Sequence, residues 1–263
     1  MSYAAVNGTK LFYRIDGAAN GAAPWLVLSN SLGSDVSMWT PQLVEFSKHF
    51  RVLRYDTRGH GHSDVPPGPY TIEQLTGDVI GLMDHLGIER AHFAGLSMGG
   101  LTGVGLGARY ASRIDRLVLC NTAAKIGSPE VWGPRAAKAR NEGMLALADA
   151  VLPRWYTAGF MERNPLVIAQ ARDVFAHTDN EGYASNCDAL NAADLRGEAR
   201  SITAPTLVIS GTHDLAATPA QGRELAESVP GARYVELDAS HISNVELAGP
   251  FTKTVADFLR EAR

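Results

Sequence analysis

Continuous apolar runs separated by amphipathic stretches are the feature that most limits what this chain can fold into. The apolar runs occupy residues 25–28, 52–55, 91–96, 117–120, 206–209 and 234–237. Runs of this length, apolar on both faces, are typical of buried parallel strands. Apolar residues at helical spacing fill the stretches 41–49, 72–86, 101–110, 220–229 and 250–263. This alternation predicts an α/β fold with a mostly parallel, doubly wound sheet and right-handed crossovers.

Two regions depart from this alternation. At the N-terminus, Asn7-Gly8 lies between two β-prone runs, residues 3–6 and 10–15, which predicts a hairpin. Between residues 123 and 198, strand-like runs stop and helical fragments rich in Ala, Arg, Trp and Met replace them. We therefore expect residues 1–122 and 199–263 to form the core, and residues 123–198 to form a helical lid insert over the carboxyl edge of the sheet.

Composition excludes several classes of protein. With 263 residues, 45% of them apolar, the chain is long enough to bury a large core. The net charge of -4 comes from 24 basic and 28 acidic residues spread along the chain, which argues against a nucleic-acid partner. No signal peptide is recognisable, and no segment approaches the about 18 uninterrupted apolar residues of a membrane span. We expect a cytoplasmic protein in which Cys120 and Cys187 are free thiols; no oligomeric state is predicted.

A short glycine-flanked motif follows the third apolar run. Residues 95–99 read Gly-Leu-Ser-Met-Gly, and a helical pattern starts near residue 100. This is the G-x-S-x-G nucleophile elbow between a strand and a helix, whereas an ordinary glycine-rich turn is the alternative. The turn forces the serine into strained backbone geometry, and side chains in place of Gly95 or Gly99 would collide with neighbouring elements. We therefore predict Ser97 as a nucleophile.

A serine hydroxyl needs a base within hydrogen-bond reach and a third group that orients the base. In folds with this elbow, the chain order is serine, acid, histidine. Asp214 follows the apolar run 206–209 and His241 follows the run 234–237, so both emerge at the carboxyl edge of the sheet. His213 adjoins Asp214 and is the main competitor for the base, but chain order favours His241.

An acyl-transfer site also needs backbone N–H donors for the developing oxyanion. The residue after the nucleophile, Met98, supplies one donor in this fold, and the loop after the third strand, here the run 25–28, supplies the other. That loop, residues 29–33, reads Ser-Asn-Ser-Leu-Gly. We predict Leu32 as the second donor, with Gly33 making room for the backbone; the alternative is a simple turn.

One segment resembles a metal site. Residues 56–64 contain the pattern His60-x-His62-x-Asp64, which resembles the zinc motif of the metallo-β-lactamase family. That family has a further histidine after the aspartate, where this chain has Val65, and no other cluster completes a site of three or four ligands. We expect a tight turn in which Arg58, His60 and Asp64 make local hydrogen bonds, and we predict neither a metal nor a cofactor.

Over nearly its whole length the chain resembles the α/β-hydrolase superfamily, and within it the bacterial 3-oxoadipate enol-lactonases. The closer resemblance lies in residues 28–33, 51–61, 65–70 and 241–246, of which the last read His-Ile-Ser-Asn-Val-Glu. It implies the α/β-hydrolase fold and hydrolysis of an enol-lactone to 3-oxoadipate during the breakdown of aromatic compounds. Ser97 would form the acyl-enzyme, His241 would act as base beside Asp214, and Leu32 and Met98 would hold the oxyanion.

The small anionic lactone that the resemblance implies needs a cationic or donor-rich partner in a dry pocket. In the insert, Trp132, Arg135 and Lys138 are three residues apart, so on a helix they share a face. We predict that they cap the pocket and that Ser31 also contacts substrate. The alternative is a merely solvated basic face.

Other functions fit the same pattern. A broader carboxylesterase or a carbon–carbon bond hydrolase would use the same fold and triad. A dehalogenase is disfavoured because it needs an aspartate at the position of Ser97. A non-catalytic ligand receptor on this fold is the alternative outside enzymes, and it is disfavoured because serine, acid and histidine are all present.

Overall fold

A computed structural model describes residues 2–17 and 23–261 of the chain. Within these residues, eight strands form one sheet in the order β1-β2-β4-β3-β5-β6-β7-β8. Their bounds are β1 (Ser2–Val6), β2 (Thr9–Gly17), β3 (Trp25–Ser29), β4 (Arg51–Tyr55), β5 (Ala91–Leu96), β6 (Ile114–Cys120), β7 (Thr206–Gly211) and β8 (Arg233–Leu237). From β4 to β8, neighbouring strands pair in parallel. All six predicted strands are confirmed.

The N-terminal hairpin is also confirmed. β1 pairs with β2 in antiparallel fashion, and β2 pairs in the same sense with β4. Asn7 and Gly8 have φ angles of 46° and 71°. These left-handed conformations are what a two-residue hairpin turn of this twist requires, and asparagine and glycine adopt them most readily.

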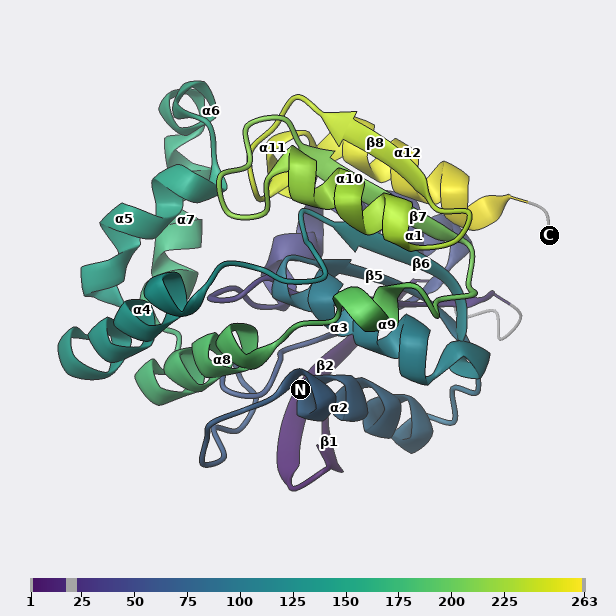
Figure 1. The fold of residues 1–263 in the computed structure, drawn as a ribbon, viewed down its shortest axis with the longest axis horizontal. Coiled ribbons are helices and arrows are strands. Elements are labelled where there is room, and N and C mark those ends of the chain that lie inside the picture. The colour runs from purple at the N-terminus through teal and green to yellow at the C-terminus, as the bar shows by residue number, and fades with distance from the viewer. Residues whose placement is uncertain (1, 18–22, 262–263) are drawn as a thin grey trace.

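Helices cover both faces of the sheet (Figure 1). They are η1 (Val36–Gln42), α1 (Leu43–His49), α2 (Ile72–His85), α3 (Met98–Arg109), η2 (Ala111–Arg113), α10 (Pro219–Ser228), α11 (Ser243–Glu246) and α12 (Ala248–Arg260). α3 contacts β5 and β6, and α10 contacts β7 and β8, whereas α1 contacts β2, β4 and α12. The sheet is therefore doubly wound, as predicted.

The start of α3 differs from the prediction. The apolar spacing predicted a helix from residue 101, but α3 begins at Met98, directly after the serine of the elbow. Gly99, Gly100 and Gly103 have low intrinsic helix propensity, which hid the first turn. Packing explains their presence, since a side chain on Gly100 would lie 2.6 Å from Thr122, and one on Gly103 would lie 2.9 Å from Leu119.

The region between β6 and β7 is helical. It contains α4 (Pro129–Glu142), α5 (Leu145–Trp155), α6 (Ala158–Arg163), α7 (Pro165–Ala176), α8 (Asn180–Ala192) and α9 (Arg196–Ala199). Helices α4 to α8 lie together at one side of the sheet (Figure 1). α9 packs instead against α3 and α10, so the last residues of the predicted insert, 196–198, lie against the core.

The strands that lead to the predicted site form a buried platform. Every residue of β5 and β7 is buried, and β3 and β6 are buried over most of their length. Loops at the carboxyl ends of these strands are therefore held from below by close packing. Among the described residues, no helix is both long and apolar enough to cross a membrane.

Candidate active site

Ser97 lies at the sharp turn between β5 and α3. Its backbone angles are φ 57° and ψ −114°, a conformation that a residue with a side chain rarely adopts. Two neighbours hold the turn: the Ser97 N–H donates to the Cys120 carbonyl oxygen at 2.9 Å, and the Thr122 hydroxyl donates to the Ser97 carbonyl oxygen at 2.8 Å. The strained backbone predicted for the elbow is confirmed.

The two flanking glycines are required by close backbone approaches. A Cβ on Gly95 would lie 2.1 Å from the Gly99 carbonyl oxygen. A Cβ on Gly99 would lie 2.4 Å from the carbonyl oxygen of Ser29, in the loop after β3. Because these neighbours are main-chain atoms, they cannot move aside cheaply, and the predicted collisions are confirmed.

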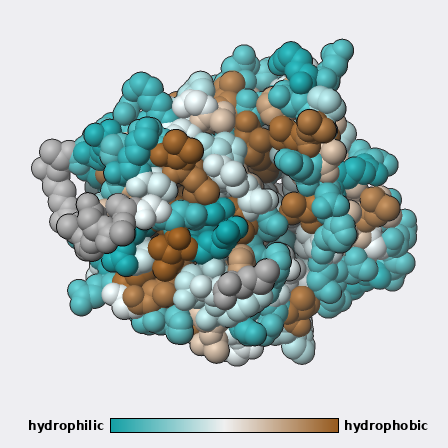
Figure 2. Space-filling view, turned by 180° about the vertical axis from the view of Figure 1, so that it is seen from behind, coloured by the Kyte–Doolittle hydropathy of each residue, from teal (hydrophilic) through white to brown (hydrophobic). Residues whose placement is uncertain are grey.

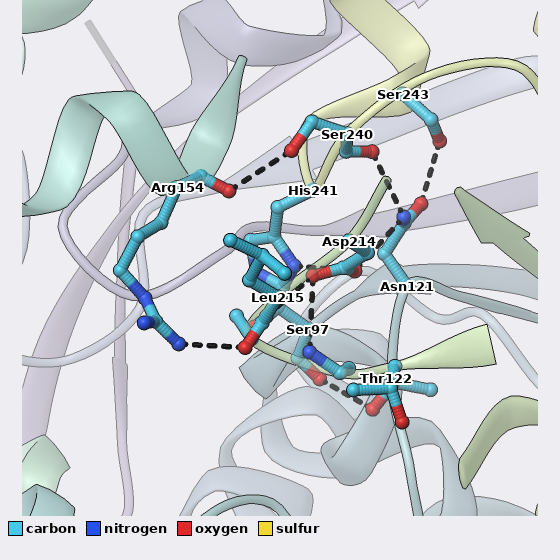
Figure 3. Close-up of polar contacts among 12 residues, drawn as sticks. Ser97, Asn121, Thr122, Arg154, Asp214, Leu215, Ser240, His241 and Ser243 are labelled. Atoms are coloured by element: carbon cyan, nitrogen blue, oxygen red, sulfur yellow. Dashed lines mark hydrogen bonds and ion pairs between the residues drawn. The ribbon is translucent and has the colours of Figure 1, made fainter. Parts of the chain in front are cut away.

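Asp214 and His241 come together at the carboxyl ends of β7 and β8. His241 Nδ1 lies 2.8 Å from Asp214 Oδ2, and both residues are 2% exposed (Figure 3). The other oxygen, Oδ1, accepts from the N–H groups of Ala216 at 2.7 Å and Ala217 at 3.0 Å. Since an ionised carboxylate can only accept, His241 Nδ1 is the donor in this contact, and Nε2 is the nitrogen left to act as base.

The surroundings of Asp214 favour its charged form. Burial raises the pKa of this carboxyl, but the His241 charge and hydrogen bond, together with the N–H groups of Ala217 and Ala216, hold the pKa below its usual value. The rival histidine lies elsewhere: His213 Nε2 is 2.8 Å from Asp238, and these side chains are 55% and 89% exposed. The side chain of His213 therefore leaves the loop toward solvent, as expected.

The loop after β3 leaves one backbone donor free. The Ser31 N–H donates to Met38 Sδ at 3.3 Å, and the Gly33 N–H donates to His60 Nε2 at 2.8 Å. Between them, the N–H of Leu32 has no acceptor within residues 2–17 and 23–261. Ser31 itself is 1% exposed. A free donor at Leu32 is what the predicted oxyanion hole requires.

The elbow leaves a second donor free beside the first. The Gly99 N–H donates to the Asn30 carbonyl oxygen at 3.1 Å, which ties the start of α3 to the loop containing Leu32. Met98 is the first residue of α3, so its N–H has no acceptor in the helix, and none of the other described residues supplies one. The oxyanion role of Leu32 and Met98 stays a prediction, which this geometry favours.

The turn after β4 supports that loop. Arg58 forms a bidentate pair with buried Asp78, with both N–O distances 2.6 Å. Burial lowers the pKa of His60 to about 4, so the ring stays neutral and Nε2 can accept from Gly33. Of the local hydrogen bonds predicted for this turn, His60 makes one, from its N–H to the Thr57 carbonyl oxygen at 2.9 Å, whereas the Arg58 side chain pairs with Asp78 of α2, outside the turn. Asp64 contributes main-chain atoms, because its carbonyl oxygen accepts from the Gly59 N–H at 2.9 Å.

The predicted basic face lies on α4, but its three residues differ in surroundings. Trp132 is buried and its Nε1 donates to the Ile126 carbonyl oxygen at 2.6 Å. The Arg135 guanidinium lies 5.4 Å from the Trp132 ring centroid and has no ion-pair partner among the residues described. Lys138 lies 3.8 Å from Glu142 and its side chain is 41% exposed. Arg135 and Lys138 are both half-buried, so Arg135 differs from Lys138 in having no carboxylate partner among the described residues.

Tyr183 packs against the loop after β3. Burial raises the pKa of Tyr183, and the charge of Arg135 opposes that rise. A Cβ on Gly33 would lie 3.1 Å from the Tyr183 ring and 2.7 Å from Phe175. The insert therefore packs directly on the loop that carries Leu32.

The insert also holds the histidine loop. The Ile242 N–H donates to the Trp155 carbonyl oxygen at 3.0 Å, and the Ser240 hydroxyl donates to the Arg154 carbonyl oxygen at 3.1 Å (Figure 3). Glu246 accepts from the Ser240 N–H at 2.9 Å. Glu246 had no predicted role, although its position in the motif 241–246 was a signal.

A cavity of about 630 Å³ lies beside this junction. Its walls come from η1, from α5 to α7 and from the histidine loop, and include Met38, Trp155, Phe160, Val174 and Ile242. In the space-filling view, hydrophobic side chains gather around a hollow on the side that carries the insert (Figure 2). Cavities of this size and largely apolar lining are typical of small-molecule sites.

The fold and this constellation define a class of protein. A nucleophile elbow, a buried Asp–His pair and two free N–H groups lie at the carboxyl edge of a doubly wound sheet, although no hydrogen bond joins Ser97 Oγ to His241 among the described residues. The sequence model of the α/β hydrolase fold family matches residues 24–247. The chain belongs to this family.

Three named proteins are similar to this chain over most of its length. The chain is 44% identical to "3-oxoadipate enol-lactonase 2" of Acinetobacter baylyi over 232 residues, which cover 88% of this chain and 87% of that protein. It is 38% identical to "3-oxoadipate enol-lactonase 1" of the same organism, covering 96% and 94%. The crystal structure of the enol-lactonase from Burkholderia xenovorans LB400 superposes with a TM-score of 0.98 at 75% identity, covering 99% and 100%.

Proposed function

We propose that this chain hydrolyses 3-oxoadipate enol-lactone to 3-oxoadipate, with Ser97 as nucleophile, His241 as base and Asp214 as the group that orients the base. The assignment of the substrate rests on the similarity to enol-lactonases, which reaches 75% identity over 99% of the chain. The 2.8 Å contact between His241 and Asp214, at the same edge of the sheet as a strained serine, supports the chemistry.

In the first half-reaction, Ser97 Oγ attacks the lactone carbonyl carbon while His241 Nε2 takes the hydroxyl proton. The Leu32 and Met98 N–H groups donate to the oxyanion, and each such donor is worth on the order of a hundredfold in turnover. The ring C–O bond then breaks, and His241 returns its proton to the departing enol oxygen. The enol relaxes to a ketone, which removes the nucleophile that would close the ring again.

In the second half-reaction, water is the nucleophile, and the ketone formed from the enol stays attached to the acyl chain. His241 Nε2 takes a proton from a water molecule, whose oxygen attacks the acyl carbon held by Ser97. The same two N–H groups stabilise the second oxyanion, and the Ser97–acyl bond breaks as His241 returns the proton to Oγ. Groups of the protein supply every proton transfer in this scheme, so it needs neither a metal nor a cofactor.

The proposed substrate is an anion, and Arg135 is suited to bind its carboxylate. Its guanidinium has no ion-pair partner within the described chain, is half-buried, and lies against Trp132. A guanidinium in such a place binds a planar carboxylate through paired hydrogen bonds. Lys138 would add positive charge beyond it, and the Ser31 hydroxyl would contact the substrate on the opposite side.

The insert, residues 123–198, serves in this proposal as a lid on a core of residues 1–122 and 199–263. Support comes from the packing of Phe175 and Tyr183 on Gly33 and from the hydrogen bond between Ile242 and Trp155. Small anionic lactones, rather than nucleic acids or membranes, are the proposed partners of a cytoplasmic enzyme.

The test is a side-by-side measurement of kcat/KM on 3-oxoadipate enol-lactone and on p-nitrophenyl acetate. A large preference for the enol-lactone is expected, because only that substrate offers a carboxylate to Arg135. Equal or reversed values would contradict the assigned substrate and would favour a broader carboxylesterase. Cleavage of a carbon–carbon bond in a β-diketone, without lactone hydrolysis, would favour the other alternative.

A further inference from the structure

A buried asparagine that the scheme above does not use lies between the nucleophile and the acid. Asn121 follows the last residue of β6, the strand between β5 and β7. Its N–H donates to the Ile209 carbonyl oxygen of β7 at 2.7 Å, while the preceding residue, Cys120, accepts from the Ser97 N–H at 2.9 Å. Asn121 is fully buried, so its main chain is fixed to the strands that carry both groups.

The side-chain amide of Asn121 binds the acid directly. Its Nδ2 donates to Asp214 Oδ2 at 3.1 Å and to the Ser240 carbonyl oxygen at 3.2 Å (Figure 3). Its Oδ1 accepts from the Ser243 hydroxyl at 2.5 Å. A carboxylate and a carbonyl oxygen can only accept, so the orientation of the amide is fixed by chemistry, and Ser243 holds it there.

These contacts close a ring. Asp214 Oδ2 accepts from both Asn121 and His241, and Ser243, which orients Asn121, lies two residues after His241 in the motif 241–246. With Ala216 and Ala217 on Oδ1, each carboxylate oxygen accepts two hydrogen bonds. The carboxylate therefore cannot rotate without breaking a hydrogen bond on each oxygen, and its direction toward His241 is set from every side.

We propose that Asn121 is a positioning residue for Asp214, and that Ser243 acts through Asn121 by orienting its amide. This inference rests on the proposed roles of Ser97, Asp214 and His241. It gives the serine of the motif 241–246 a function: the motif supplies the base, His241, and two residues later Ser243, which orients Asn121 against Asp214.

A purely conformational role for Asn121 is the alternative. Its φ angle is 47°, and asparagine is common in that region of backbone space because its side chain tolerates it. The variant Asn121→Gly separates the two roles, since glycine adopts the same backbone conformation without cost but has no amide. A conformational role predicts retained turnover, and a positioning role predicts lost turnover.

The experiment measures kcat and KM of Asn121→Gly, Ser243→Ala and the double variant, with Ser228→Ala on the surface as control. We expect Asn121→Gly to lower kcat about 10- to 100-fold, as for a lost hydrogen bond to a charged group, with KM changed less than about twofold. The double variant should match Asn121→Gly alone, because Ser243 acts through Asn121. In an Asp214→Asn background, Asn121→Gly should lower kcat no further.

Three results would overturn the inference: wild-type kcat in Asn121→Gly, effects of Asn121→Gly and Ser243→Ala that multiply, or an undiminished effect of Asn121→Gly in the Asp214→Asn background. Each variant is measured on both the enol-lactone and p-nitrophenyl acetate. Wild-type turnover of p-nitrophenyl acetate without turnover of the enol-lactone would contradict the proposed substrate alone. The effect of Asn121→Gly on the acetate ester then tests Asn121 separately.

Discussion

The carboxyl edge of the sheet and the helical insert are built in different ways. At the edge, main-chain atoms determine position: Gly99 lies against the Ser29 carbonyl, and N–H groups of Ala216 and Ala217 hold Asp214. In the insert, contacts between side chains mostly determine position, as in the exposed ion pair between Arg140 and Glu181. We infer that the edge sets the rate of the chemistry and that the insert sets which substrate is bound.

The two regions are nevertheless joined through main-chain contacts. A Cβ on Gly59, in the turn after β4, would lie 2.6 Å from Gly182 of α8. On the other side of the site, the Ile242 N–H donates to the Trp155 carbonyl oxygen at 3.0 Å. Substitutions of insert residues that contact the substrate should therefore change KM, whereas substitutions at these two junctions should also disturb the edge.

The largest effect on kcat is expected from substitution of Asp214. Asp214→Asn keeps the shape of the side chain but removes the charge that holds His241 Nδ1 in its protonated form, so kcat should fall on the order of 10⁴-fold. KM should change little, because Asp214 contacts no substrate in the proposed scheme. Steady-state kinetics provide the check, and a fall in kcat below tenfold would contradict the assignment of the acid.

Gly99→Ala should lower kcat less than Asp214→Asn does, but it should still strongly disturb the carboxyl edge of the sheet. The new Cβ would lie 2.4 Å from the Ser29 carbonyl oxygen, so the loop carrying Leu32 must shift away from Met98. Loss of one oxyanion donor predicts a decrease in kcat of about 10²- to 10³-fold. Gly133→Ala on α4 is the matched control, since nothing lies within 4 Å of its added Cβ. Equal kcat values in the two variants would refute the argument.

In the insert, the expected effect falls on binding. Arg135→Ala should raise KM for the enol-lactone about 10- to 100-fold, the cost of a lost charge-assisted hydrogen bond, and leave kcat nearly unchanged. KM for p-nitrophenyl acetate, which has no carboxylate, should stay the same. Arg163→Ala, an exposed arginine of the same insert, is the control. An unchanged KM for the enol-lactone in Arg135→Ala would remove this residue from the site.

The smallest predicted effect is on the free energy of unfolding, and it arises from His60, whose ring accepts from the Gly33 N–H. The pKa of His60 is lowered to about 4 in the folded protein, so between about pH 6.5 and 4 the unfolded chain binds the extra proton, and stability falls as pH falls, by up to roughly 3 kcal/mol. Burial raises the pKa of Asp56 to about 6, which gives the opposite trend. The wild type and the two histidine variants that test this effect all retain Asp56.

His60→Gln removes the pH dependence caused by His60 and leaves the one caused by Asp56. The glutamine side chain still offers an acceptor for the Gly33 N–H. Urea unfolding between pH 4 and 6.5 should therefore show a smaller loss of stability on acidification than in the wild type. The surface variant His177→Gln, whose side chain is 78% exposed in the wild type, should retain the wild-type slope. The same slope in all three proteins would show that His60 does not titrate as inferred.

The sequence predicted those features that short segments determine. Apolar runs located β3 to β8, Asn7-Gly8 located the hairpin, and the elbow motif located Ser97 and its strained backbone. Asp214 and His241 were placed at strand ends, and parallel strands bring their carboxyl ends to the same edge. Local patterns sufficed because each of these features depends on neighbours in the sequence.

What the sequence did not predict depends on distant partners. Asn121 meets Ser243 across 122 positions in the sequence, and neither residue carries a pattern that indicates this contact. The first turn of α3 was hidden because glycines selected for packing weaken the helical signal. On α4, equal spacing could not distinguish Arg135, which has no carboxylate partner among the described residues, from Lys138, which lies beside Glu142.

The nucleophile is the point on which the whole account depends. A fluorophosphonate forms a covalent bond only with a hydroxyl that a neighbouring base activates, so mass spectrometry of the labelled protein identifies the nucleophile. We predict one adduct, on the peptide that contains Ser97, and no adduct together with about a millionfold lower turnover in Ser97→Ala. Labelling of another residue, or retained turnover in Ser97→Ala, would contradict the account.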